Sequence, residues 1–344
     1  MVGFFPSYFY SSCKKCTPVN SIRFFIMLNN INRRKFVTST AASAAGILIG
    51  SHLKGMAVPA REREEEEKPS AKSKYDIMKE VMKYRKIDTH AHIYFTDNSP
   101  GEQLDYGERL GIEKQVISRY LDVFPGTPEQ FRKYNDLTIK AIKKYPDHLL
   151  GGFVLNPVYR KESLEEIKRC SDEGMIGTGE LYYQVKINDP LYFPIIEKLI
   201  DLKMIIFSHG ECQLGVGGYR MKYNGNKAPN TSIPEDFVDI ARRYPEGIFQ
   251  YAHIGGGGDW EYECKLFKDY PNIYVDTSGS NNAENMIDFA VELLGEDRLF
   301  YGADESYYQS VGKILASNLT ESQKRKVFFD NYNNILRKGG RNVD

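Results

Sequence analysis

The chain has 344 residues, of which 41% are hydrophobic and 27% are charged. This composition is typical of a soluble globular protein and argues against intrinsic disorder as its main state. Residues 1–60 contain seven basic and no acidic residues, so the remainder carries 39 basic against 46 acidic residues. An acidic body argues against a nucleic-acid partner, which requires a basic surface. Only three of the five cysteines lie beyond residue 60, which argues against a disulfide framework.

The first 60 residues are typical of a twin-arginine export signal. The sequence Asn-Arg-Arg-Lys-Phe at 32–36 precedes a mildly apolar stretch of small residues at 37–50. This pattern predicts transfer to the periplasm by the export machinery; a basic N-terminus without a targeting role is the alternative. The stretch is too short and too weakly apolar for a good membrane span, although an uncleaved signal would tether the protein to the membrane.

A charged segment follows the predicted signal. Residues 61–74 consist largely of glutamate, lysine and arginine, which predicts a solvated linker. We therefore expect the folded domain to occupy residues 75–344.

Within that domain, short apolar segments alternate with amphipathic ones. Buried strands are predicted at 86–92, 113–120, 149–156, 174–181, 204–209, 248–254, 272–277 and 298–304. Helices are predicted at 127–145, 160–173, 189–203, 232–244, 282–295 and 320–337, whereas the 93–112 link is the least convincing helix.

The alternation of strands and helices predicts an α/β fold with a parallel sheet. Eight units within residues 75–344 match the size of a (β/α)8 TIM barrel. An open, doubly wound sheet is the main alternative. It lacks support because no Gly-x-Gly-x-x-Gly follows the first strand; the glycine run at 255–258 follows the sixth.

Four of the five histidines beyond residue 60 lie at predicted strand ends, which is the most informative pattern in the sequence. His90 and His92 are two residues apart on the first strand, so their side chains point to the same face. His209 and His253 end the fifth and sixth strands. His148 follows a helix-to-strand turn at the opposite end, where we expect only a structural role.

Two carboxylates occupy equivalent positions. Glu180 ends the fourth predicted strand and Asp304 the eighth. Active sites of TIM barrels lie at the carboxyl ends of the strands, and imidazole with carboxylate suits zinc or another transition metal. We expect His253 to act in catalysis rather than as a ligand. For Glu180 we leave two roles open, as a ligand of a second metal or as a partner of a basic substrate group.

These residues resemble the amidohydrolase superfamily. The sequence Ile-Asp-Thr-His-Ala-His at 87–92, with His209, His253 and Asp304, is most similar to its amidohydrolase 2 branch, which includes aminocarboxymuconate-semialdehyde decarboxylase and related hydrolases. Further similar segments are Ala-Arg-Arg-Tyr-Pro at 241–245, Tyr-Ala-His-Ile-Gly-Gly at 251–256 and Phe-Phe-Asp-Asn-Tyr at 328–332. The resemblance spans roughly residues 84–338.

The resemblance implies one divalent metal, usually zinc, held by His90, His92, His209 and Asp304. It implies that His253 orients or polarises the substrate and that Asp304 shuttles a proton. Glu180 stands where binuclear relatives carry a carboxylated lysine, so the number of metal ions, one or two, stays open. The residues after His253 differ from those of the decarboxylases, which weakens any inference about the substrate.

The predicted function is hydrolysis of an ester, lactone or amide carbonyl of a small molecule by metal-bound hydroxide. Non-oxidative decarboxylation of an unsaturated or aromatic acid is the alternative, and a catalytically silent binding protein is a third. A nucleic-acid phosphodiesterase also fits a strand-four glutamate, but the acidic body counts against it. A homodimer is left open.

Three further residues are candidates for substrate binding. Arg220 lies in a long predicted loop at 210–232, and its guanidinium suits a substrate carboxylate. Arg119 ends the second predicted strand, and Trp260 is the only tryptophan. The alternatives are a solvated loop for Arg220 and simple packing for Trp260.

Overall fold

The computed structural model describes residues 76–93, 99–182, 184–211, 230–254, 259–279, 281–341 and 343. The predicted export signal and linker, Arg220 and the glycine run at 255–258 lie outside the described residues. Among the described helices, none is long and apolar enough to cross a membrane.

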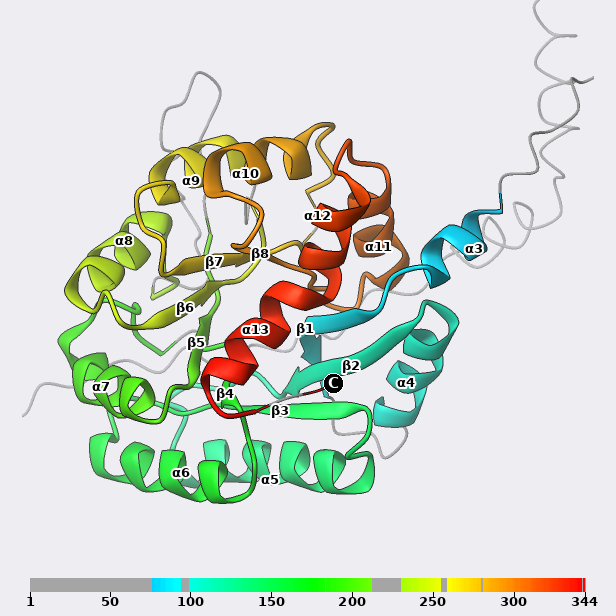
Figure 1. The fold of residues 1–344 in the computed structure, drawn as a ribbon. Coiled ribbons are helices and arrows are strands. Elements are labelled where there is room, and N and C mark those ends of the chain that lie inside the picture. The colour runs from blue at the N-terminus through cyan, green and yellow to red at the C-terminus, as the bar shows by residue number, and fades with distance from the viewer. Residues whose placement is uncertain are drawn as a thin grey trace, which may run out of the picture. The chain divides into compact units, whose positions relative to one another are not determined.

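Eight parallel strands form one sheet in the order of the sequence, as Figure 1 shows. Their bounds are β1 (Lys86–His92), β2 (Ile112–Ser118), β3 (Leu149–Phe153), β4 (Gly177–Thr178), β5 (Ile205–Ser208), β6 (Ile248–Tyr251), β7 (Ile273–Asp276) and β8 (Leu299–Phe300). Two backbone hydrogen bonds join the last strand segment to the first: Thr89 N donates to Tyr301 O at 2.9 Å, and Asp304 N donates to His90 O at 2.7 Å. The predicted TIM barrel is therefore confirmed.

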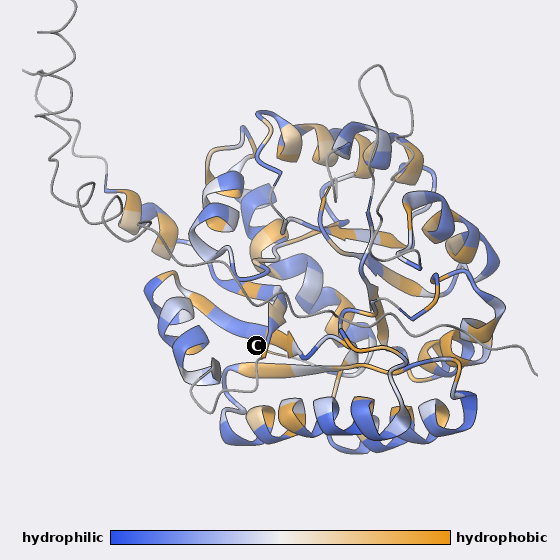
Figure 2. Ribbon diagram, turned by 180° about the vertical axis from the view of Figure 1, so that it is seen from behind, coloured by the Kyte–Doolittle hydropathy of each residue, from blue (hydrophilic) through white to orange (hydrophobic). Residues whose placement is uncertain are grey.

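The sheet is surrounded by helices α4 (Ser99–Arg109), α5 (Pro128–Lys144), α6 (Arg160–Asp172), α7 (Phe193–Asp201), α8 (Pro234–Arg243), α9 (Trp260–Phe267), α10 (Met286–Leu294) and α11 (Tyr307–Leu315). Helix α3 (Ile77–Met82) precedes β1, and α12 (Glu321–Arg325) and α13 (Asn331–Lys338) belong to the C-terminal segment. Figure 2 shows hydrophilic residues over their outer surfaces and hydrophobic residues in the strands and on the helix faces turned toward them. This amphipathic arrangement is what buries the core.

Some predicted elements differ from the observed ones. The 93–112 link contains helix α4, while α3, α9 and α11 were not predicted. The helix predicted at 320–337 consists of α12, a π-helical turn η2 (Lys326–Asp330) and α13. The fourth and eighth strands are only two residues long, although backbone pairing continues beyond them: Leu181 forms a parallel bridge with Ser208, and Asp304 N donates to His90 O.

The C-terminal segment closes the opposite end of the barrel, where the strands begin. Asn331 Nδ2 donates to the carbonyls of Glu296 and Leu299 at 2.8 and 2.9 Å, and Tyr301 N donates to Val327 O. The phenyl ring of Phe328 packs against Tyr301, with 5.4 Å between ring centroids. Closure at this end leaves the carboxyl ends of the strands for the site.

The pairing of the two-residue strand β4 with β5 requires glycine at position 177. A Cβ atom at Gly177 would lie 2.4 Å from the carbonyl oxygen of Ile205 on β5, closer than nonbonded atoms approach. We predict that Gly177→Ala lowers the free energy of unfolding by about 3 kcal/mol or more, because backbone cannot move aside as a side chain can. Gly312→Ala on α11 is the matched control, since nothing lies within 4 Å of its added Cβ. It is expected to stabilise by about 0.5–1 kcal/mol; equal effects in urea unfolding would contradict the close approach.

Candidate metal centre

The carboxyl ends of five strands bring the predicted metal and catalytic residues together. Three overlapping groups of these side chains have ligand atoms within 4.8 Å of one another. The residues in these groups are His90 and His92 from β1, Glu180 after β4, His209 after β5, His253 after β6 and Asp304 after β8. Residues more than 200 positions apart in the sequence therefore form one cluster.

His90 and His92 form the centre of this cluster. Their Nε2 atoms lie 3.1 Å apart. Glu180 Oε2 is 3.3 Å from His92 Nε2 and 3.7 Å from His90 Nε2, and Asp304 Oδ1 lies at the same two distances from these nitrogens. Two imidazole nitrogens and two carboxylate oxygens thus converge on one point.

Glu180 also reaches the other two histidines with its second oxygen. Its Oε1 lies 2.6 Å from His209 Nδ1 and 3.5 Å from His253 Nε2. The carboxylate therefore lies between two pairs of imidazoles, with one oxygen directed at each pair.

Burial and charge explain how this cluster behaves without a metal. Glu180 is only 5% exposed, and His90 is fully buried. Burial alone would raise the pKa of Glu180, but the charges and hydrogen bonds of the surrounding histidines hold it well below its usual value. Burial would likewise lower the pKa of His90, but Asp276 and Glu180 raise it well above its usual value.

The donor set fits a divalent transition metal. Ionised carboxylates accept hydrogen bonds but donate none, so the converging oxygens require protons or a cation between them and the imidazoles. A divalent ion replaces those protons, and imidazole nitrogen with carboxylate oxygen is the donor combination that zinc, manganese and related ions take. His90, His92, Glu180 and Asp304 supply the converging atoms, with His209 beside them.

The affinity for metal is expected to depend on pH. Burial would lower the pKa of His209, but the charge of Glu180 and their hydrogen bond raise it to about 9. Below pH 9 the metal-free site therefore holds a proton that metal binding displaces, so affinity rises with pH, by about tenfold per unit for each displaced proton. Chelator competition with zinc at pH 6, 7 and 8 measures this slope; a flat profile would contradict it.

Asp276 and Ser278 contact two histidines of the cluster, and neither was predicted from the sequence as a site residue. His90 Nδ1 lies 3.1 Å from Asp276 Oδ2, and His253 Nδ1 lies 2.9 Å from Ser278 Oγ. Both residues are fully buried. Asp276 ends β7, so the strand-end rule that identified Glu180 and Asp304 also applies to it. Carboxylates that accept the distal N–H of a ligating histidine are a common feature of metal sites.

Aromatic rings line one side of the cluster. The ring of Tyr120 lies edge-on to His92, with 4.8 Å between centroids. Tyr182 lies edge-on to His209 at 4.1 Å, and the two tyrosine rings are 6.2 Å apart. We refer to Tyr120 and Tyr182 as the tyrosine wall.

The other substrate-binding candidates lie in packed positions. The guanidinium of Arg119 pairs with Asp122 at 2.8 Å and lies over the ring of Tyr120, and the residue is 6% exposed. Trp260 packs edge-on against Phe289 of α10, with 5.1 Å between centroids. Arg119 therefore lies against Tyr120, whose ring contacts His92, and Trp260 packs at the start of α9 against α10.

Two residues of the cluster adopt a left-handed backbone conformation. His253 and Asp304 adopt positive φ angles of 65° and 43°, and Glu305 follows at 64°. Residues other than glycine rarely adopt this left-handed conformation, which costs of order 1–3 kcal/mol and concentrates at functional sites. The backbone of His253 and Asp304 is therefore strained in the conformation that directs their side chains into the cluster.

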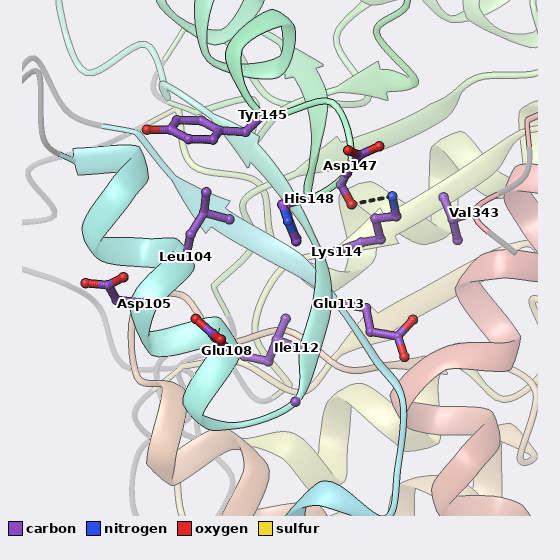
Figure 3. Close-up of a pocket in the computed structure, with 11 residues that line it drawn as sticks. Leu104, Asp105, Glu108, Ile112, Glu113, Lys114, Tyr145, Asp147, His148 and Val343 are labelled. Carbon is purple, nitrogen blue, oxygen red and sulfur yellow. Dashed lines mark hydrogen bonds between the residues drawn. The ribbon is translucent and has the colours of Figure 1, made fainter.

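A separate cavity of about 810 Å³ lies at the opposite end of the barrel, beside the start of β2. Figure 3 shows His148, Tyr145 and Asp147 on one side of it and residues of α4 on the other. His148 is exposed there, at the end where the strands begin, as predicted.

Solved structures share this fold at low sequence identity. The 5-carboxyvanillate decarboxylase of Sphingomonas paucimobilis has a TM-score of 0.57 and 16% identity, covering 74% of this chain and 99% of that one. A dihydroxybenzoic acid decarboxylase from a Polaromonas species, with bound manganese and the inhibitor 2-nitroresorcinol, has a TM-score of 0.55 and 16% identity, covering 74% and 97%. The 4-oxalomesaconate hydratase of Rhodopseudomonas palustris has a TM-score of 0.56 and 16% identity, covering 74% and 96%.

A search of curated proteins found no match. The sequence profile of the Amidohydrolase family (Amidohydro_2), however, matches residues 87–331, which include every described residue of the cluster. The match extends over more than half of the chain and confirms the predicted superfamily and branch. The chain belongs to the Amidohydrolase family.

Proposed function

We propose that this protein is a metal-dependent hydrolase that cleaves an ester, lactone or amide bond of a small molecule. The observation that carries this proposal is the position of Asp304. One of its oxygens lies 3.3 Å from His92 Nε2, and the other lies 3.8 Å from His253 Nδ1. The carboxylate is 32% exposed. It therefore lies between the metal ligands, the proposed catalytic histidine and solvent, where hydrolysis requires a proton carrier.

We assign the metal to His90, His92, His209 and Asp304, with Glu180 as an additional ligand. When bound, such an ion acts as a Lewis acid and lowers the pKa of water to about 7. The donor set suits zinc, and manganese is the ion in the decarboxylase from the Polaromonas species. Asp304 then accepts the proton of the attacking water and returns it to the leaving group, while His253 contacts the substrate.

Decarboxylation is the second candidate because of the tyrosine wall. The rings of Tyr120 and Tyr182 flank His92 and His209, an arrangement that suits a planar substrate. Decarboxylases of aromatic acids share the fold. In this reaction the same residues hold the metal and the substrate carboxylate, and a proton is delivered to carbon.

The two reactions give different products. The purified protein would be incubated with zinc or manganese and with separate panels of lactones, esters, amides, and aromatic or unsaturated acids. Hydrolysis of an ester or lactone releases a carboxylate and a proton, and hydrolysis of an amide releases a carboxylate and an amine, in each case without carbon dioxide. Decarboxylation releases carbon dioxide and consumes a proton. Acid release that disappears in Asp304→Asn supports the hydrolase; carbon dioxide release supports the second candidate.

We also propose that the chain is exported to the periplasm by its twin-arginine signal. The support is the pair Arg33 and Arg34 before the mildly apolar stretch at 37–50. Fractionation of a bacterial host should find the protein in the periplasm, and replacing both arginines by lysine should retain it in the cytoplasm. Equal distribution of both proteins would contradict export by this route.

A further inference from the structure

The segment that follows β7 contains a buried hydrogen-bond network around Asp276. Its Oδ1 accepts from the backbone N–H groups of His253 and Ser278 at 3.2 and 3.0 Å, and from the Ser278 hydroxyl. Its Oδ2 lies 3.1 Å from His90 Nδ1 and 3.3 Å from Gln250 Nε2. Donor groups therefore surround a fully buried carboxylate, which is the environment of an ionised acceptor.

The direction of each hydrogen bond follows from a count of protons. The Ser278 hydroxyl has one proton, and its closest acceptor is the charged Asp276 Oδ1. If that proton pointed elsewhere, two acceptor oxygens would face each other without a proton between them. Ser278 Oγ therefore has only lone pairs left for His253 Nδ1, which lies at 2.9 Å. His253 must then donate its Nδ1 proton to Ser278.

This proton placement determines what His253 presents to the site. With the proton on Nδ1, His253 turns its Nε2 edge toward the cluster, where Glu180 Oε1 lies at 3.5 Å. The same network holds His90, whose Nδ1 lies 3.1 Å from both Asp276 Oδ2 and Ser278 Oγ and whose Nε2 faces His92. The two lone pairs of Ser278 Oγ can accept from both imidazoles. One carboxylate thus orients a metal-ligand histidine directly and the proposed catalytic histidine through a serine.

The backbone around Ser278 is built to hold this arrangement. Gly279 has a φ of 87°, and a Cβ atom there would lie 3.0 Å from His253 Cβ. Lys313 Nζ donates to the carbonyls of Gly279 and Thr277 at 2.7 and 3.3 Å. Ser278 therefore has little freedom to turn its hydroxyl away from His253.

We infer that Ser278 is a positioning residue that accepts a hydrogen bond from the Nδ1 proton of His253 and so holds the Nε2 edge of this ring toward the metal-binding cluster. The importance of this role for turnover rests on the proposed function. The presence of the Nδ1 proton does not, because it is a property of the free protein. Failure of one is therefore distinguishable from failure of the other.

The test is nitrogen NMR of the full-length protein labelled with ¹⁵N-histidine, both metal-free and loaded with diamagnetic zinc. The His253 signals are identified by their absence in His253→Gln. We expect the His253 ring to carry a proton on Nδ1 in the wild type, in both forms of the protein. In Ser278→Ala we expect a mixture of tautomers or a shift of the proton to Nε2.

Thr277→Val is the matched control. Thr277 is equally buried, and its hydroxyl accepts from Gly302 N rather than contacting His253. This variant should retain the wild-type tautomer. Once a substrate is known, kcat should fall about 10- to 100-fold in Ser278→Ala, the usual cost of losing such a partner. A wild-type His253 ring without a proton on Nδ1, or unchanged protonation of Nδ1 in Ser278→Ala, would overturn the inference.

Discussion

Replacing Asp304 by asparagine is expected to reduce kcat by about 100- to 10,000-fold, the range that a positioned acid–base group contributes. The carboxylate lies 3.3 Å from His92 Nε2 and 3.8 Å from His253 Nδ1, so its charge acts on both. Burial alone would raise the pKa of Asp304, but the hydrogen bond to His92 and the charges of His90 and His253 hold it well below its usual value. The wild-type group is therefore ionised, and its charged oxygens can hold a metal ion or take a proton from water that the metal has acidified, whereas the amide of asparagine carries no charge.

Asparagine is a suitable replacement because Asp304 adopts a φ of 43°. Asparagine tolerates this left-handed conformation better than most residues, so we expect the backbone conformation at position 304 to be unchanged. The exposed residue Asp330, which lies at the other end of the barrel, provides the control Asp330→Asn. Steady-state kinetics on the substrate found in the panel would measure both variants. An Asp304→Asn enzyme with more than about one tenth of wild-type kcat would refute the proton-carrier role.

Replacing Glu180 by glutamine is expected to weaken metal binding by more than about 100-fold. Losing an outer partner of a metal ligand already costs 10- to 100-fold, and Glu180 directs its own oxygens at the metal-binding atoms. Oε2 lies 3.3 Å from His92 Nε2, and Oε1 lies 2.6 Å from His209 Nδ1. Glutamine has nearly the same shape but no charge, so the loss reports on electrostatics rather than on packing. Titration of the metal-free protein with zinc in a chelator buffer measures the affinity.

Glu211→Gln is the control for this titration. Glu211 Oε1 lies 3.5 Å from His209 Nε2, so it is a carboxylate beside the same imidazole, but it is in none of the groups that include His90 or His92. We expect a smaller loss of affinity in this variant. Equal losses in the two variants would mean that Glu180 acts only as general negative charge near His209 and is not a ligand.

The fold could be predicted almost completely because its signals are local. Each strand is a short apolar run, and the eightfold alternation with helices is visible without knowledge of any tertiary contact. The missed helix α9 is only eight residues long, and its start depends on Asp259, whose side chain accepts from Tyr262 N. The missed helix α11 is only nine residues long and contains Gly312, which lowers its intrinsic helix propensity. Such short elements are stabilised mainly by packing, which sequence periodicity alone does not reveal.

The site could be predicted only in part. Histidine and carboxylate at strand ends identified the six residues of the cluster, because the carboxyl ends of parallel strands meet at one end of a barrel. Asp276 ends β7 in the same way, but nothing in its local sequence separates a residue that orients a ligand from a ligand. The roles of Ser278 and the tyrosine wall depend on contacts between segments far apart in the sequence, so only the structure could show them.

The central claim is that His90 and His92 hold a divalent metal ion together with the carboxylates around them. Its most direct test is elemental analysis of the full-length protein, loaded with zinc or manganese and then freed of excess ion, beside His90→Ala/His92→Ala. We expect about one tightly bound ion per chain in the wild type and almost none in the double variant. Two ions per chain would assign the second to Glu180, His209 and His253. A folded wild-type protein without metal, or a double variant that retains the same amount, would contradict the claim.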